Sequence, residues 1–134
     1  MATKFEIMRV YYASDYFSKR RSAAVVLSVL ADHANQDGTG ITASTTTIAL
    51  EANMDAANTR HIITQLAKDG ILIKTGAKPT KAGRPINTYR LGLPNHIRDQ
   101  VVADWEERGA SLWRIKGCLD LKKQLQLEQA RLAT

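Results

Sequence analysis

The stretch TASTTTIALEANMDAANTRHIITQLAKDGILI, residues 42–73, decides the fold. Apolar residues recur at helical spacing on either side of a short polar corner, residues 53–55. Asn53 suits the left-handed backbone at a helix end, and Asp55 suits the N-cap of a following helix. The stretch therefore predicts two helices joined by a tight turn, and then a strand that begins after Gly70.

The second of these helices, expected over residues 56–69, has two unlike arcs. The arc expected to face inward contains Thr59, Ile62, Ile63 and Leu66. The opposite arc contains Ala57, His61, Thr64 and Lys68, and it is flanked by Arg60 and Gln65. This division predicts a helix with one side held in a core and the other side free to contact a ligand.

Another helix is expected before this pair. Ser18 can cap it, and apolar residues follow at helical spacing: Ala23, Val26, Leu27, Leu30, Ala31 and Ala34. The turn-forming run NQDGTG, residues 35–40, then ends the helix. Either Ser44 or Thr45 is expected to cap the first helix of the pair.

The region after Gly70 has the composition of a β-hairpin. Residues 71–75 and 86–91 are rich in strand-forming types, and the run GAKPTKAGRP, residues 76–85, separates them. This loop carries Lys78, Lys81 and Arg84 and has no acidic residue. The pattern predicts two antiparallel strands with a positively charged loop between them.

The two ends of the chain differ from this central part. The run KFEIMRVYYA, residues 4–13, is rich in aromatic and β-branched types, which predicts a strand or extended arm within residues 1–17. Pro94 and Asn95 can start a helix with Ile97, Val101 and Trp105 on one side, and Gly109 ends it.

A last helix is expected from Ser111 to about residue 132, and it has two apolar stripes. They contain Leu112, Ile115 and Leu119, and Cys118, Leu121, Leu125 and Leu132. Residues 97–113 can pack back on the central part, but two stripes offer more apolar surface than one contact covers. We therefore expect a homodimer formed through the C-terminal helices, residues 93–134.

Charge is unevenly distributed in this chain of 134 residues, whose formal net charge is +6. Residues 23–55 contain no Lys or Arg. Residues 56–94 carry Arg60, Lys68, Lys74, Lys78, Lys81, Arg84 and Arg90 against Asp69 alone. Arg20 and Arg21 add to the positive N-terminal segment, although a solvated face is the simpler interpretation there. Such clustering favours a polyanionic partner.

Other classes of function receive little support from the sequence. The single cysteine and three scattered histidines give no zinc-site spacing, so no metal and no cofactor are expected. No phosphate loop, nucleophile motif or convergent carboxylate pair occurs, and we expect no enzyme. No run is long and apolar enough to span a membrane, and no secretory signal is recognised, so a cytoplasmic protein is expected.

Several phrases occur in an order that resembles a known family. LADHANQDGT stands at residues 30–39, GILI at 70–73 and GRPINTYRL at 83–91. Between them lie Ser44, Thr47, Ile48, Ala49, Asn53, Met54, Asp55, Asn58, Thr59 and Leu66. Residues 18–91 thereby resemble the winged-helix modules of phage and plasmid replication-initiation proteins and related small regulators.

The resemblance implies a mostly α fold with a small β-hairpin wing, a winged helix-turn-helix over residues 18–92 with additional C-terminal helices. It implies sequence-specific binding of double-stranded DNA through recognition helix 56–69 and basic wing 76–85. The expected DNA contacts are Ser44, Thr45, Asn58, Arg60, His61, Thr64, Gln65, Lys68, Lys78, Lys81 and Arg84. Ala56 and Ala57 depart from the family, which often has bulkier polar residues there.

Two functions remain open at this point. The first is a DNA-binding factor of a phage, plasmid or other mobile element that regulates transcription or binds a replication or partition site. A replication or transcription protein could then dock on the C-terminal helices. The alternative is a protein-interaction module in which those helices are the active surface and the wing charges only aid solubility.

Overall fold

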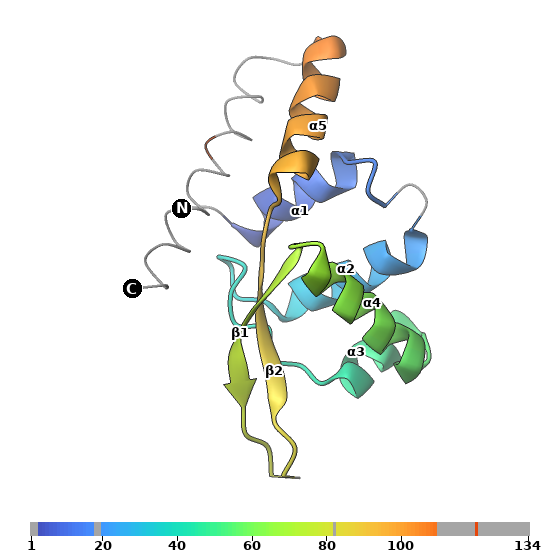
Figure 1. Cartoon of the computed structure of the whole chain (residues 1–134), viewed down its shortest axis with the longest axis vertical. Helices are drawn as coiled ribbons and strands as arrows, with labels where there is room; N and C mark the ends of the chain where they lie inside the picture. Colours follow the sequence, from blue (N-terminus) through green and yellow to red (C-terminus); the bar gives the residue numbers. More distant parts are fainter. Residues whose placement is uncertain (1–2, 18–19, 82, 110–119, 121–134) are drawn as a thin grey trace.

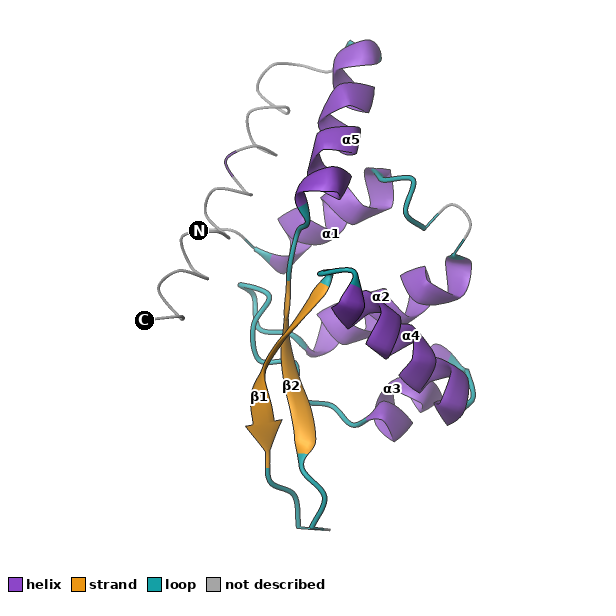
Figure 2. Cartoon of the chain, viewed as in Figure 1, coloured by secondary structure: helices purple, strands orange, loops and turns teal. Residues whose placement is uncertain are grey.

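The computed structural model describes residues 3–17, 20–81, 83–109 and 120, and these combine helices with one β-hairpin (Figures 1 and 2). The expected mixed α+β class is confirmed. The elements are α1 Lys4–Ala13, α2 Arg21–His33, α3 Thr45–Ala52, α4 Ala56–Lys68, β1 Leu72–Lys78, β2 Ile86–Leu91 and α5 Asn95–Glu107. The hairpin projects away from the helices at the end opposite α5 (Figure 1).

The N-terminal segment is helical, so the strand or arm predicted there is wrong. Thr3 caps α1 by accepting a hydrogen bond from the amide of Glu6. The helix buries Ile7, Met8, Val10 and Tyr11. These residues recur at helical spacing, and their burial against the rest of the fold overrides the strand propensity of their side chains.

The corner between α3 and α4 has the predicted conformation. Asn53 adopts a left-handed backbone, with φ 56° and ψ 49°, and ends α3. Asp55 caps α4, because its Oδ2 accepts from the amide of Asn58 at 2.9 Å. Ser44 caps α3, and Thr45 is the first helical residue. Ser18, expected to cap the preceding helix, lies outside the described residues.

The hairpin is antiparallel, with Leu72 opposite Leu91. β1 extends to Lys78, beyond the predicted end at residue 75, because a register shift between Lys74 and Gly76 accommodates an extra residue. On the other side of β2, Ile41 exchanges two backbone hydrogen bonds of 3.0 Å with Tyr89. The segment before α3 is thereby fastened to the hairpin.

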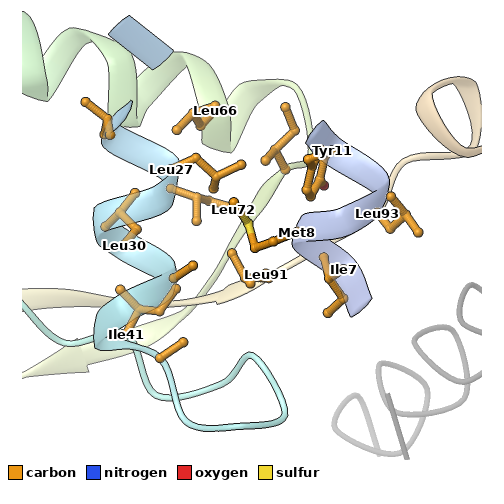
Figure 3. Close-up of a cluster of buried hydrophobic side chains, with 14 of the residues drawn as sticks. Ile7, Met8, Tyr11, Leu27, Leu30, Ile41, Leu66, Leu72, Leu91 and Leu93 are labelled. Atoms are coloured by element: carbon orange, nitrogen blue, oxygen red, sulfur yellow. The ribbon is translucent and has the colours of Figure 1, made fainter. Parts of the chain in front are cut away.

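One hydrophobic cluster draws side chains from all five described helices and from both strands. Leu27 and Leu30 of α2 lie near its centre (Figure 3). Around them the close-up shows Met8 and Tyr11 of α1, Leu66 of α4, Leu72 of β1 and Leu91 of β2 (Figure 3). The outer helices and the hairpin are therefore held by a shared core.

α5 begins and ends close to the predicted limits. Pro94 is its N-cap residue, and Ile97 and Val101 are buried while Trp105 is partly buried against the core. This side of α5 packs back on the fold. The apolar stripes from Leu112 to Leu132, and with them the predicted dimer contact, lie outside the described residues. No described helix is long and apolar enough to cross a membrane.

Arg90 of β2 is buried in spite of its charge. Its side chain is only 2% exposed. Hydrogen bonds from Thr39 hold the pKa of the Asp37 carboxyl below its ordinary value, and the charge of Arg90 lowers it further. β2 therefore buries one cation close to the turn that follows α2.

We predict that the stability of the corner between α3 and α4 depends on how easily residue 53 adopts a left-handed backbone. Asn53→Ala should lower the free energy of unfolding by about 1 kcal/mol, because alanine disfavours the left-handed conformation. Asn53→Gly should change it by less than about 0.5 kcal/mol, because glycine adopts that conformation freely. Urea denaturation followed by circular dichroism measures both values. Equal stability of the two variants would contradict the prediction.

Candidate nucleic-acid interface

α4 presents a polar surface to solvent. The outward face of α4 is formed by the exposed side chains of Asn58, Arg60, His61, Thr64 and Lys68. Gln65, also predicted as a contact, is half-buried, and Ala57 is exposed between the polar residues. Every predicted contact residue of this helix except Gln65 is therefore openly accessible.

The opposite side of α4 is fixed in the core. Ile63 and Leu66 are buried, and Thr59 is fully buried. The Thr59 hydroxyl donates to the carbonyl of Asp55 at 2.9 Å, so its polar atom is satisfied. Ile62 is partly buried against the core. The predicted inward arc is confirmed, and its burial sets which side chains face solvent.

A polar cluster fixes the C-terminal end of α4. The Asp69 carboxylate accepts hydrogen bonds from the hydroxyl of Tyr16 and, at 3.2 Å, from the side-chain amide of Gln65. Arg20 lies 3.6 Å from the same carboxylate, and its guanidinium is 4.6 Å from the centre of the Tyr16 ring. The end of α4 is therefore joined to the segment that connects α1 and α2.

No pattern in the sequence predicts this cluster. Tyr16 and Asp69 are separated by 53 residues, and neither belongs to a motif that would relate them. Gln65 also has a different role from the predicted one, because its amide group donates to Asp69. Its position at the base of the outward face makes it a support for α4 as well as a candidate contact.

The residues at the start of α3 are less accessible than predicted. Ser44 and Thr45 are both half-buried. The Ser44 hydroxyl accepts from the amide of Thr47 at 3.2 Å and lies 3.0 Å from the Thr47 hydroxyl. Ser44 therefore acts first as a helix cap.

The hairpin carries the second group of predicted contacts. Lys78, Lys81 and Arg84 are all exposed. The loop is ordered by the hydroxyl of Thr80, which donates to the carbonyl of Arg84 at 2.6 Å. The projecting hairpin thus carries Lys78 at the end of β1 and Lys81 and Arg84 in the loop, and its sequence contains no acidic residue (Figure 1).

Metal binding finds no support in the described part of the chain. No three His, Cys, Asp or Glu residues among the described positions are arranged to hold a metal ion. The exposed groups of α4 and the hairpin instead include the cations Arg60, Lys68, Lys78, Lys81 and Arg84. Groups of this kind suit an anionic partner.

A scan against protein-family models, a search of curated proteins and a search of solved structures each find no match.

We predict that the free energy of unfolding decreases at alkaline pH and that ionisation of Tyr16 contributes to this decrease. Burial, and then the hydrogen bond to Asp69 and its negative charge, raise the pKa of Tyr16 from 10.0 to about 12. The stabilising contribution of the neutral phenol is present below pH 10 and is lost as pH rises towards about 12. The free energy of unfolding should therefore decrease less over this range in Tyr16→Phe than in the unmodified protein.

Urea denaturation at several pH values between about 9 and about 12 measures this difference. Tyr12→Phe is the matched control, because Tyr12 is 65% exposed and its hydroxyl lies 2.9 Å from that of Ser28, away from Asp69. An identical pH dependence in Tyr16→Phe and the unmodified protein would show that folding does not raise the pKa of Tyr16.

Proposed function

We propose that this protein binds double-stranded DNA sequence-specifically as a winged helix-turn-helix. In this proposal α2, α3 and α4 form the helical part, α4 is the recognition helix and the hairpin is the wing. One observation carries the proposal. α4 is buried along one side, exposes polar and basic side chains along the other, and is followed directly by a hairpin with a cationic, acid-free loop.

The outward face of α4 has the chemistry needed to read base pairs. The major groove of B-DNA is about 12 Å wide and accepts one α-helix. An arginine such as Arg60 can donate two hydrogen bonds to guanine, and an asparagine such as Asn58 can do the same for adenine. His61 and Thr64 lie between them and Lys68, so they would meet neighbouring base edges or phosphates.

The wing would supply affinity without sequence preference. Lys78, Lys81 and Arg84 are exposed on the projecting hairpin, where they can neutralise phosphates and release counterions. Ala56 and Ala57 provide no charged contact at the start of α4. In this protein the wing should therefore carry a larger part of the binding energy than the first turn of the recognition helix.

The biological setting we propose follows from the resemblance seen in the sequence. The protein would act on DNA of a phage, plasmid or other mobile element, as a transcriptional regulator or as a factor that binds a replication or partition site. Two copies joined through the C-terminal helices would place two recognition helices on a site with two half-sites, about one helical turn apart.

We predict that the wing charges are essential for DNA binding. The triple variant Lys78→Gln, Lys81→Gln, Arg84→Gln should bind duplex DNA at least roughly a hundredfold more weakly at moderate salt. The slope of log affinity against log salt should also decrease by about 2 to 3, because about three counterions are no longer released. Titrations of labelled duplex at several salt concentrations measure both changes.

The matched control is Arg9→Gln, Arg98→Gln, Arg108→Gln, which removes the same charge from α1, α5 and the residue after α5. It should bind almost as well as the unmodified protein. If both triple variants lose the same affinity, only net charge matters and the wing has no special role. If the unmodified protein binds no DNA, the interaction module becomes the better explanation.

We predict that Arg60 contributes sequence preference. A preferred site is first obtained by selecting bound duplexes from a random pool with the unmodified protein. Arg60→Ala should then lose about 1–3 kcal/mol of discrimination at one base pair of that site. Lys68→Ala, on the last turn of α4, should weaken binding to all sequences more evenly. Unchanged preference in Arg60→Ala would exclude base contact by this residue.

A further inference from the structure

A groove of about 550 Å³ lies between the start of α2 and one side of α4. Ala23, Ile62 and Leu66 provide apolar lining. The polar lining comes from Arg20, Arg21 and Ser22 on the α2 side and from three residues of α4, Asn58, His61 and Gln65. The three α4 residues follow one another at intervals of three and four positions, so they form one row along the helix. The groove therefore borders the proposed recognition surface along its length.

The other half of the outward face does not take part in this groove. Arg60, Thr64 and Lys68 form a second row at intervals of four, and none of them lines the groove. α4 thus has one row directed to the groove and another row away from it. If α4 enters the major groove of DNA, the side of the helix that meets α2 faces a flanking phosphate backbone.

Arg20 is held in position at the rim of this groove. Its side chain is half-exposed, and its guanidinium stacks 4.6 Å from the Tyr16 ring centre and lies 3.6 Å from the Asp69 carboxylate. A cation that is already oriented loses less conformational freedom when it binds. A guanidinium also matches a phosphate with two parallel hydrogen bonds.

The charges around the groove favour an anion. Arg21 is exposed, and the first turn of α2 carries no acidic side chain. Asp69 is the acid in contact with Arg20, but it does not line the groove and already accepts from Tyr16 and Gln65. His61 adds a hydrogen-bonding ring on the opposite wall.

We propose that this groove seats a backbone phosphate of the bound duplex, with Arg20 and Arg21 as its cationic contacts. The inference rests on the proposed DNA-binding function and adds to it a third point of attachment, beside the recognition helix and the wing. Because phosphate contacts fix orientation without reading sequence, this site would set how α4 sits in the major groove.

Arg21→Gln is the variant that tests the site, because Arg21 is exposed and Arg20 also supports Asp69. We expect affinity for duplex DNA to fall roughly three- to tenfold and the salt slope to decrease by about 1. The preference for a selected site over random duplex should remain unchanged. Arg108→Gln, whose side chain is 77% exposed beyond α5, is the control and should show neither change.

A second measurement locates the contact. Single phosphates of the selected duplex are replaced in turn by uncharged methylphosphonates, and each duplex is titrated with both proteins. The unmodified protein should lose affinity at a phosphate flanking the major groove, and Arg21→Gln should be insensitive at that same position. Removing the phosphate charge and the Arg21 charge, separately and together, distinguishes one direct contact from the general effect of charge.

The outcomes separate this proposal from the one on which it rests. If the wing variant loses affinity for DNA while Arg21→Gln behaves like Arg108→Gln, phosphate binding in the groove is excluded and the proposed DNA binding is retained. If inorganic phosphate raises the melting temperature of the unmodified protein more than that of Arg21→Gln, and both proteins bind DNA equally, the groove holds a free anion instead. If the unmodified protein shows no salt-dependent DNA binding, both proposals are overturned.

Discussion

The described fold depends on burial of one face of α2. Val26, Leu27 and Leu30 are at most 1% exposed. Side chains of α1, α4 and both strands lie in the same cluster as Leu27 and Leu30 (Figure 3). Burying one such side chain stabilises a protein by about 1.5–3 kcal/mol. Because α4 and both strands share this contact, the outward face of α4 keeps a fixed relation to the base of the hairpin. A surface made of two separate elements needs such a common support if it is to fit one rigid partner.

Long-range hydrogen bonds hold the elements around this apolar core in fixed orientations. The ammonium group of Lys4 donates to the carbonyls of Ala31 and Ala34 at 2.9 Å, at the C-terminal end of α2. The Tyr11 hydroxyl donates to the carbonyl of Gly92, just after the hairpin. Hydrogen bonds therefore join α1 to the end of α2 and to the residue that follows β2. The Tyr16 bond to Asp69 does the same for the end of α4.

Much of the central architecture could be predicted because its signals are local. A left-handed residue at position 53, a cap at Asp55 and the spacing of Thr59, Ile63 and Leu66 each act within a few residues of the chain. The exposure of Lys78, Lys81 and Arg84 also follows from a loop whose side chains are mostly polar or small. By contrast, α1 was mistaken for a strand or arm, because short runs of aromatic and β-branched residues suit either structure until their packing partners are known.

The sequence by itself determined the helix pair, its corner, the two faces of α4 and the cationic hairpin loop. Only the tertiary structure decided that α1 belongs to the core, that Arg90 is buried and that Gln65 supports Asp69. It alone placed Arg20 and Arg21 beside the row of α4 residues that includes His61. The physical reason is the range of the interactions. Caps, turns and periodicity are set by neighbouring residues, whereas burial and grooves arise when segments distant in the chain pack together.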